Sequence, residues 1–269
     1  MTLRLFAPLF ILAAAAPPQE TAGGGKIKVE AVGLHINKAP YLGDKDFARP
    51  MEPTPGTLVS VLVVLDEGGI IRLDANKSKL AKFADDKGTD LLAAKPAGDS
   101  FNSGPIGAFP KISKDQKAIL VDLQAAAAPA AGAKSLTLEG SLSFTVGKDQ
   151  EAVKQEKVAA RKDAAFKVGG LEFKIKEAGK NEFGDDPMRI SLESKDGLKV
   201  ARIRFFDSAG TEIESRLDSH GVMSMGDEAT HSWDFALKKL VQTVTVEVAV
   251  WKKVTVVDVP LKLGVSAGL

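Results

Sequence analysis

Alternating apolar and polar residues run through most of the chain and predict β-strands. Between residues 136 and 146 the even positions are apolar or glycine and the odd positions are polar. Successive side chains of a strand point to opposite faces, so such a segment buries one face and exposes the other. Similar alternation occurs at 173–176, 188–193, 202–205 and 233–238. Residues 58–65 are apolar at nearly every position, which predicts a strand covered on both faces. No segment has a helical stripe, and the pattern predicts an all-β protein.

The chain contains the same pattern twice. Residues 83–91 have the sequence FADDKGTDL, and residues 205–213 have the sequence FFDSAGTEI. Two further pairs of segments match in the same order, 135–139 with 243–247 and 156–161 with 257–262. Because the order is kept, we predict an internal duplication of one small module. The expected modules are residues 26–163, which carry longer loops, and residues 164–269.

The repeated nine-residue segment predicts a tight hairpin turn. Asp85 and Asp207 occupy the position whose side chain accepts hydrogen bonds from the turn backbone. Gly88 and Gly210 occupy the position that requires a positive φ, and we expect them at the same place in the two turns. The spacing of the acidic residues does not fit an EF-hand calcium loop.

Short strands with turn signals every ~8–12 residues are typical of β-sandwiches. In this pattern, and in the repeated hairpin segment, the chain resembles the immunoglobulin-like tandem modules of exported bacterial proteins. The resemblance implies two tandem immunoglobulin-like β-sandwich modules. It implies no function, since the chain has no cysteine and therefore no Cys–Trp–Cys signature.

The N-terminal residues predict a cleaved signal peptide. Arg4 precedes an apolar run over residues 5–12, and Ala13–Ala16 supplies the small residues that signal peptidase requires. We place the signal peptide at residues 1–16, with cleavage at about residues 15–22. The apolar run is shorter than the ~20 residues of a membrane span. The mature protein is therefore expected to be secreted or periplasmic, without a membrane span.

Charge and motifs argue against nucleic-acid binding and catalysis. The chain has 36 basic and 35 acidic residues, which leaves no field that would attract nucleic acid. Residues 264–268 match the G-x-S-x-G pattern but lack the strand-to-helix context of a nucleophile elbow. Asp218, Ser219 and His220 are sequence neighbours and cannot form a catalytic triad. We expect a protein that is not an enzyme.

One segment carries candidate metal ligands. His220, Met223, Met225 and His231 fall within a predicted loop at residues 220–231. Imidazole and thioether groups are ligands that suit copper. A periplasmic copper-binding module is therefore the alternative function, and an ordinary exposed loop is the simpler interpretation of the same residues.

The remaining candidates concern recognition of a partner. Proline-rich or glycine-rich loops are expected at residues 37–56, 95–110 and 124–133. The aromatic residues in or beside them are Tyr41, Phe47, Phe101 and Phe109, which either contact a partner or cap the sandwich. Trp233 shares parity with core residues. Trp251 does not share parity with the core residues of its own segment, which predicts a surface position or a contact between modules. A sugar-binding surface is the least favoured function.

The favoured function is that of an exported, non-enzymatic binding or structural protein. Its partner is an unknown protein or envelope component, recognised through the loops of the first module or through an exposed strand edge.

Overall fold

The computed structural model describes residues 19–20, 26–37, 56–93, 104–107, 110–182, 184–225 and 228–267. The predicted signal peptide and the four loop aromatics Tyr41, Phe47, Phe101 and Phe109 lie outside these ranges. The all-β prediction is confirmed, since the described residues form antiparallel sheets and two short 3-10 helices, η2 (Leu91–Ala93) and η3 (Gly197–Lys199). Within these ranges no helix has the length and apolar character needed to cross a membrane.

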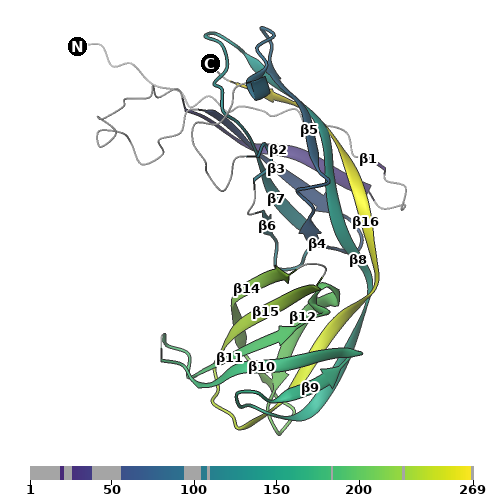
Figure 1. The fold of residues 1–269 in the computed structure, drawn as a ribbon, viewed down its shortest axis with the longest axis vertical. Coiled ribbons are helices and arrows are strands. Elements are labelled where there is room, and N and C mark those ends of the chain that lie inside the picture. Colours follow the sequence, from purple (N-terminus) through teal and green to yellow (C-terminus); the bar gives the residue numbers. More distant parts are fainter. Residues whose placement is uncertain are drawn as a thin grey trace, which may run out of the picture. The chain divides into compact units, whose positions relative to one another are not determined.

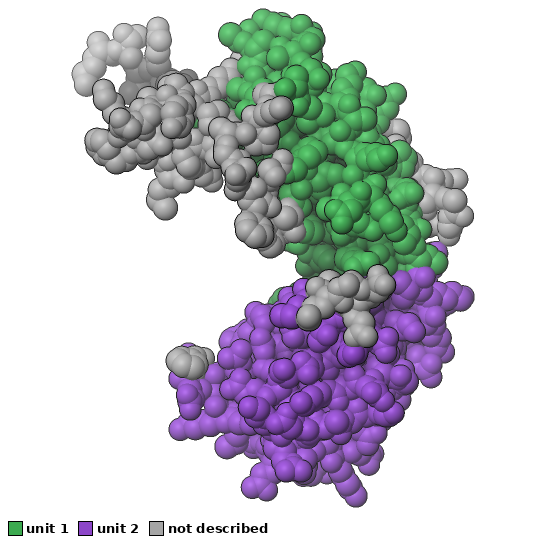
Figure 2. All heavy atoms as spheres, in the orientation of Figure 1, with its two compact units in different colours: residues 1–146, 255–269 green, residues 147–254 purple. Residues whose placement is uncertain are grey.

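The chain divides into two compact units (Figure 2). Unit 1 comprises residues 1–146 and 255–269, and unit 2 comprises residues 147–254. The two longest strands, β8 (Ser135–Ala159) and β16 (Thr243–Ser266), each contribute residues to both units. The predicted modules, 26–163 and 164–269, therefore differ from this division, because both long strands pass from one unit into the other.

Unit 1 packs two sheets around one apolar core (Figure 1). The first sheet has the order β1-β2-β3-β7-β6, and the second contains β4 and β5 beside parts of β8 and β16. Their bounds are β1 Gln19–Glu20, β2 Lys26–Asn37, β3 Gly56–Leu65, β4 Gly69–Leu73, β5 Lys79–Asp85, β6 Lys111–Ile112 and β7 Ala118–Ala125. Valines 59, 61 and 63 of β3 are fully buried, whereas Leu58, Leu62 and Val64 remain partly exposed. Among the described residues one sheet packs against this strand, so one of its faces is fully buried and the other only partly buried.

Unit 2 has the same two-sheet construction. Its first sheet has the order β9-β10-β11-β15-β14, and its second contains β12 and β13 beside parts of β16 and β8. Their bounds are β9 Ala165–Val168, β10 Leu171–Lys180, β11 Met188–Ser194, β12 Val200–Phe206, β13 Glu212–Ile213, β14 Ser215–Met225 and β15 Glu228–Leu237. The core contains Phe173, Phe205, Phe235 and Trp233, so the core position predicted for Trp233 is confirmed.

The strand order of the two units is equivalent. The two orders become identical when β1, β2 and β3 are matched with β9, β10 and β11. In the same alignment β7 matches β15, and β6 matches β14. Two of the three pairs of segments that match in sequence also pair in the same register. Phe83 of β5 lies opposite Leu138 of β8, and Phe205 of β12 lies opposite Val246 of β16.

A cross-strand pair of polar residues recurs at the same place in each first sheet. The Ser60 hydroxyl donates to Asp122 at 2.6 Å between β3 and β7, and the Ser191 hydroxyl donates to Asp234 between β11 and β15. In both units the strand on the other side of the serine has a β-bulge next to it, between Ala31 and Gly33 and between Ile175 and Glu177. This correspondence fixes which residues of the two units are equivalent.

The two predicted turns have the same geometry. Asp85 accepts hydrogen bonds from the backbone N–H groups two and four residues later, at 3.0 and 2.8 Å. Asp207 accepts the equivalent two bonds, both at 3.0 Å. Gly88 and Gly210 have φ angles of 86° and 78°. The two glycines therefore occupy the same position in turns of the same geometry.

Candidate functional site

The four predicted copper ligands lie on a hairpin rather than on a mobile loop. Residues 215–225 form β14 and residues 228–237 form β15. The register pairs His220 with Trp233 and Val222 with His231, so the two histidines share one face of the sheet. Met223 has the opposite parity and faces away from them, and Met225 is the last residue of β14. The structure therefore brings the histidines together and separates Met223 from them.

The two histidines form an aromatic cluster with Trp233. His220 Nε2 lies 3.4 Å from His231 Nδ1, and both rings stack on Trp233 with centroids 5.3 and 5.9 Å from the indole. Burial lowers the pKa of His220, which favours the neutral imidazole that can bind a metal. In the described part of the chain, no three His, Cys, Asp or Glu side chains gather around a possible metal position. The cluster therefore offers two nitrogen ligands and no complete site.

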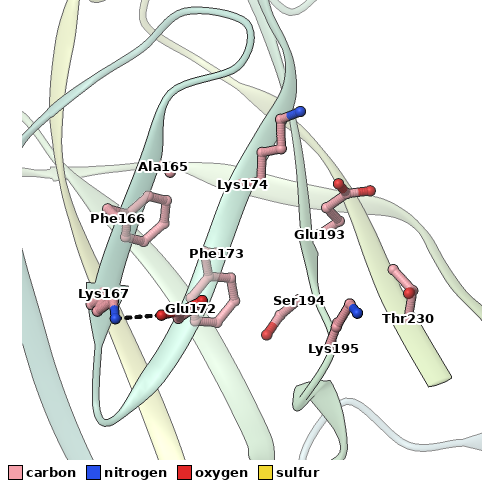
Figure 3. A pocket seen from close by; sticks show the side chains of 10 residues that line it. All are labelled: Ala165, Phe166, Lys167, Glu172, Phe173, Lys174, Glu193, Ser194, Lys195 and Thr230. Atoms are coloured by element: carbon pink, nitrogen blue, oxygen red, sulfur yellow. Dashed lines mark ion pairs between the residues drawn. The ribbon is translucent and has the colours of Figure 1, made fainter. Parts of the chain in front are cut away.

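Next to this cluster the sheet of unit 2 opens into a hollow of about 540 Å³ (Figure 3). Strands β10 and β11 are paired from Lys174 and Glu193 onward, whereas residues 171–173 of β10 have no partner on β11. The hollow lies at this place and is lined from β9, β10, β11 and β15. Phe166 and Phe173, which stack with centroids 5.3 Å apart, line it, and Phe173 also contacts Trp233.

The charged side chains that border the hollow are largely neutralised by ion pairs. The pairs are Lys167–Glu172, Lys174–Asp163 at 2.8 Å and Lys176–Glu193 at 3.3 Å. The hydrogen bond and charge of Lys167 lower the pKa of Glu172, and those of Asp163 raise the pKa of Lys174. Glu172 and Lys174 are therefore charged at neutral pH, and the three ion pairs together add no net charge to the rim.

Ser194 is a buried polar residue on the wall of the hollow. It is 3% exposed, and within the described ranges its hydroxyl has no hydrogen-bond partner. Figure 3 shows the hydroxyl directed toward the space between β10 and β11. A buried hydroxyl without a partner costs about 1–3 kcal/mol. A bound molecule could form a hydrogen bond with this side chain without breaking another bond.

The outermost strand of the same sheet is long and carries three exposed apolar side chains. β14 has 11 residues, and among the described strands none pairs with its outer edge. Leu217, Val222 and Met223 on this strand are 49%, 51% and 69% exposed. The equivalent strand of unit 1, β6, has two residues. Proteins usually shorten or charge such an edge because it invites pairing with another strand.

The structure also places the other predicted residues. Trp251 is buried, and its ring packs so closely on Gly147 that a Cβ there would lie 2.2 Å from it. The predicted surface position of Trp251 was therefore wrong, and a contact between modules stays a prediction. Residues 264–266 belong to β16, so the G-x-S-x-G match is part of a strand and not a nucleophile elbow.

The sequence-based prediction missed Ser194, Phe166 and Phe173. Phe166 and Phe173 follow ordinary core periodicity, so nothing in the pattern distinguishes them. Ser194 is recognised only when the first sheet of unit 1 is aligned with the first sheet of unit 2. The comparisons with known proteins found no matching family model, curated protein or solved structure. The function must therefore be argued from the geometry of the two units.

Proposed function

We propose that this chain is an exported, non-enzymatic binding protein that recognises an extended segment of a partner protein. The observation that carries the proposal is the outer edge of β14, which pairs with none of the described strands and has three exposed apolar side chains. A partner segment would add to the sheet as a further strand, as in other cases of β-augmentation. Main-chain hydrogen bonds would supply affinity, and the side chains beside the edge would supply specificity.

The side chains of β14 indicate the chemistry of the partner. Leu217 and Val222 lie opposite Phe235 and His231 and share the inner face, whereas Met223 lies on the outer face. Arg216 and Asp218 pair with each other at 2.8 Å and leave little net charge on this edge. A segment with apolar residues on both faces and few charges fits this edge best.

The proposal includes export and an internal duplication. The N-terminal pattern of Arg4, an apolar run and small residues supports a signal peptide and a secreted or periplasmic location. Equivalent strand order, equivalent Asp–Gly turns and the repeated Ser–Asp pair support two tandem modules of immunoglobulin-like type. In this interpretation unit 1 is the structural copy, and unit 2 has acquired the long edge strand.

Selection of binding peptides tests the proposal. We expect a library of random 12-residue peptides displayed on phage to yield apolar, extended binders of the intact protein. Binding should slow hydrogen exchange of β14 amides, because a docked strand protects the outer edge. Leu217→Lys and Met223→Lys should each weaken binding about tenfold, since lysine on an edge opposes pairing.

The matched control is Val32→Lys in unit 1. Val32 is also an exposed apolar residue on a strand, 52% exposed at the bulge of β2, but it lies outside β14. Its substitution should leave peptide affinity unchanged. Peptides that bind all variants equally, or that leave β14 exchange unaltered, would contradict strand addition.

The second candidate is a copper-binding module, favoured by the 3.4 Å separation of the two histidine nitrogens. Nitrogens at this distance are close enough to bind one ion at the usual separation of about 2.0–2.1 Å. We expect a competition titration to show stoichiometric copper binding that is lost in His220→Ala and kept in Met223→Ala, because Met223 faces away. Absence of binding at micromolar copper would exclude this candidate.

A further inference from the structure

Unit 2 carries polar residues at two core positions where unit 1 is apolar. In unit 1, Val63 of β3 pairs with Ile119 of β7, and both are fully buried. The equivalent pair in unit 2 is Ser194 of β11 and His231 of β15, and both residues are also buried. Each lies three residues along its strand from the repeated Ser–Asp pair. Burying polar groups is unfavourable unless they are hydrogen-bonded. His231 contacts His220, whereas the Ser194 hydroxyl has no partner in the described structure, so Ser194 is the residue of this pair that a bound ligand would satisfy.

The surroundings of Ser194 specify what such a ligand must contain. The hollow beside Ser194 is lined by the stacked rings of Phe166 and Phe173, so it suits a flat apolar group. The unpartnered hydroxyl of Ser194 requires one hydrogen-bonding group on the ligand. The volume of about 540 Å³ lies within the roughly 300–1,000 Å³ usual for small-molecule sites.

The ion pairs around the hollow favour a neutral ligand. Glu172, Lys174 and Glu193 are each held in an ion pair with another residue of the protein. An anionic or cationic ligand would have to break one of these pairs. A neutral ligand leaves all of them intact.

We infer that the hollow between β10 and β11 is a binding site for a neutral aromatic molecule that carries a hydroxyl group. The ring lies against Phe166 and Phe173, and the hydroxyl forms a hydrogen bond with Ser194 Oγ. At the equivalent position unit 1 has Val63, which offers no hydroxyl group.

Titration of the intact protein with phenol, followed by amide NMR, tests the inference. Phenol should produce saturable shifts at the amides of Phe173, Ser194 and Thr230, which line the hollow. Toluene has the same ring without the hydroxyl and should bind about tenfold more weakly, since it leaves Ser194 unsatisfied. Equal affinity for the two probes, or no saturable shift at millimolar phenol, would overturn the inference.

Two variants make the test specific to Ser194. Ser194→Val introduces the residue of unit 1 and should abolish the preference for phenol over toluene, and Ser194→Ala should do the same. Ser143→Ala removes another buried hydroxyl without a partner in the described structure, outside the hollow, and should keep the preference. A preference that survives both Ser194 substitutions would show that the hydroxyl is recognised elsewhere.

The inference is independent of strand addition at β14. Leu217→Lys, which should weaken peptide binding, lies outside the lining of the hollow and should bind phenol normally.

Discussion

Gly88 and Gly210 combine a left-handed backbone with open space around the α-carbon. Their φ angles are 86° and 78°, and no heavy atom lies within 4 Å of a Cβ built on either. A side chain at these positions would therefore be resisted by the backbone conformation and not by crowding. The aspartate three residues earlier holds each turn with two backbone hydrogen bonds, so the turn cannot easily relax to a negative φ.

We predict that Gly88→Val and Gly210→Val each lower the free energy of unfolding by about 1–2 kcal/mol, because β-branched residues resist positive φ. Chemical denaturation of each variant measures this loss. Gly264→Val is the control, since this strand residue has open space and no positive φ, and it should cost much less. Similar losses in all three variants would mean that conformation is not the cause.

Among the elements, η3 depends on a close approach to β15. A Cβ on Gly197 would lie 2.3 Å from His231 Cβ and 2.6 Å from Trp233 Cη2. The absence of a side chain at this position lets the helix cover the His–Trp cluster and keeps His231 buried. The sequence shows only a glycine after Asp196, and nothing near it signals this contact.

Gly197→Ala should therefore move η3 away from β15 and reduce stability by about 1–3 kcal/mol, as overpacking does in other cores. Near-UV circular dichroism should change with it, because the environment of Trp233 is altered. Gly179→Ala provides the comparison, as space around Gly179 is open. Unchanged stability and an unchanged tryptophan signal in Gly197→Ala would contradict this account of η3.

At the scale of the whole molecule, the two units share their construction and differ in what they expose. Both pack two sheets around one core, with equivalent strand order in the first sheet. Among the described residues, the 11-residue edge strand, the stacked histidines and the hollow beside Ser194 all belong to unit 2. These differences lie in one sheet, which is why we assign all three proposed binding activities to unit 2.

The sequence by itself determined the local features of this protein. Side-chain alternation identifies strands because neighbouring residues of a strand face opposite sides, and the Asp–Gly spacing identifies turns because both residues act within a few positions. The same alternation placed Trp233 in the core. These predictions succeeded because they depend on contacts between residues close together in the chain.

Only the tertiary structure decided features that depend on residues far apart. Three of these features depend on pairing between distant strands. They are the path of β8 and β16 through both units, the register that separates Met223 from His220, and the burial of Trp251 on Gly147. The hollow has the same origin, since it exists where β10 and β11 cease to pair. Periodicity gives the face of a side chain within its own strand, whereas the neighbouring strand and its register decide what that face contacts.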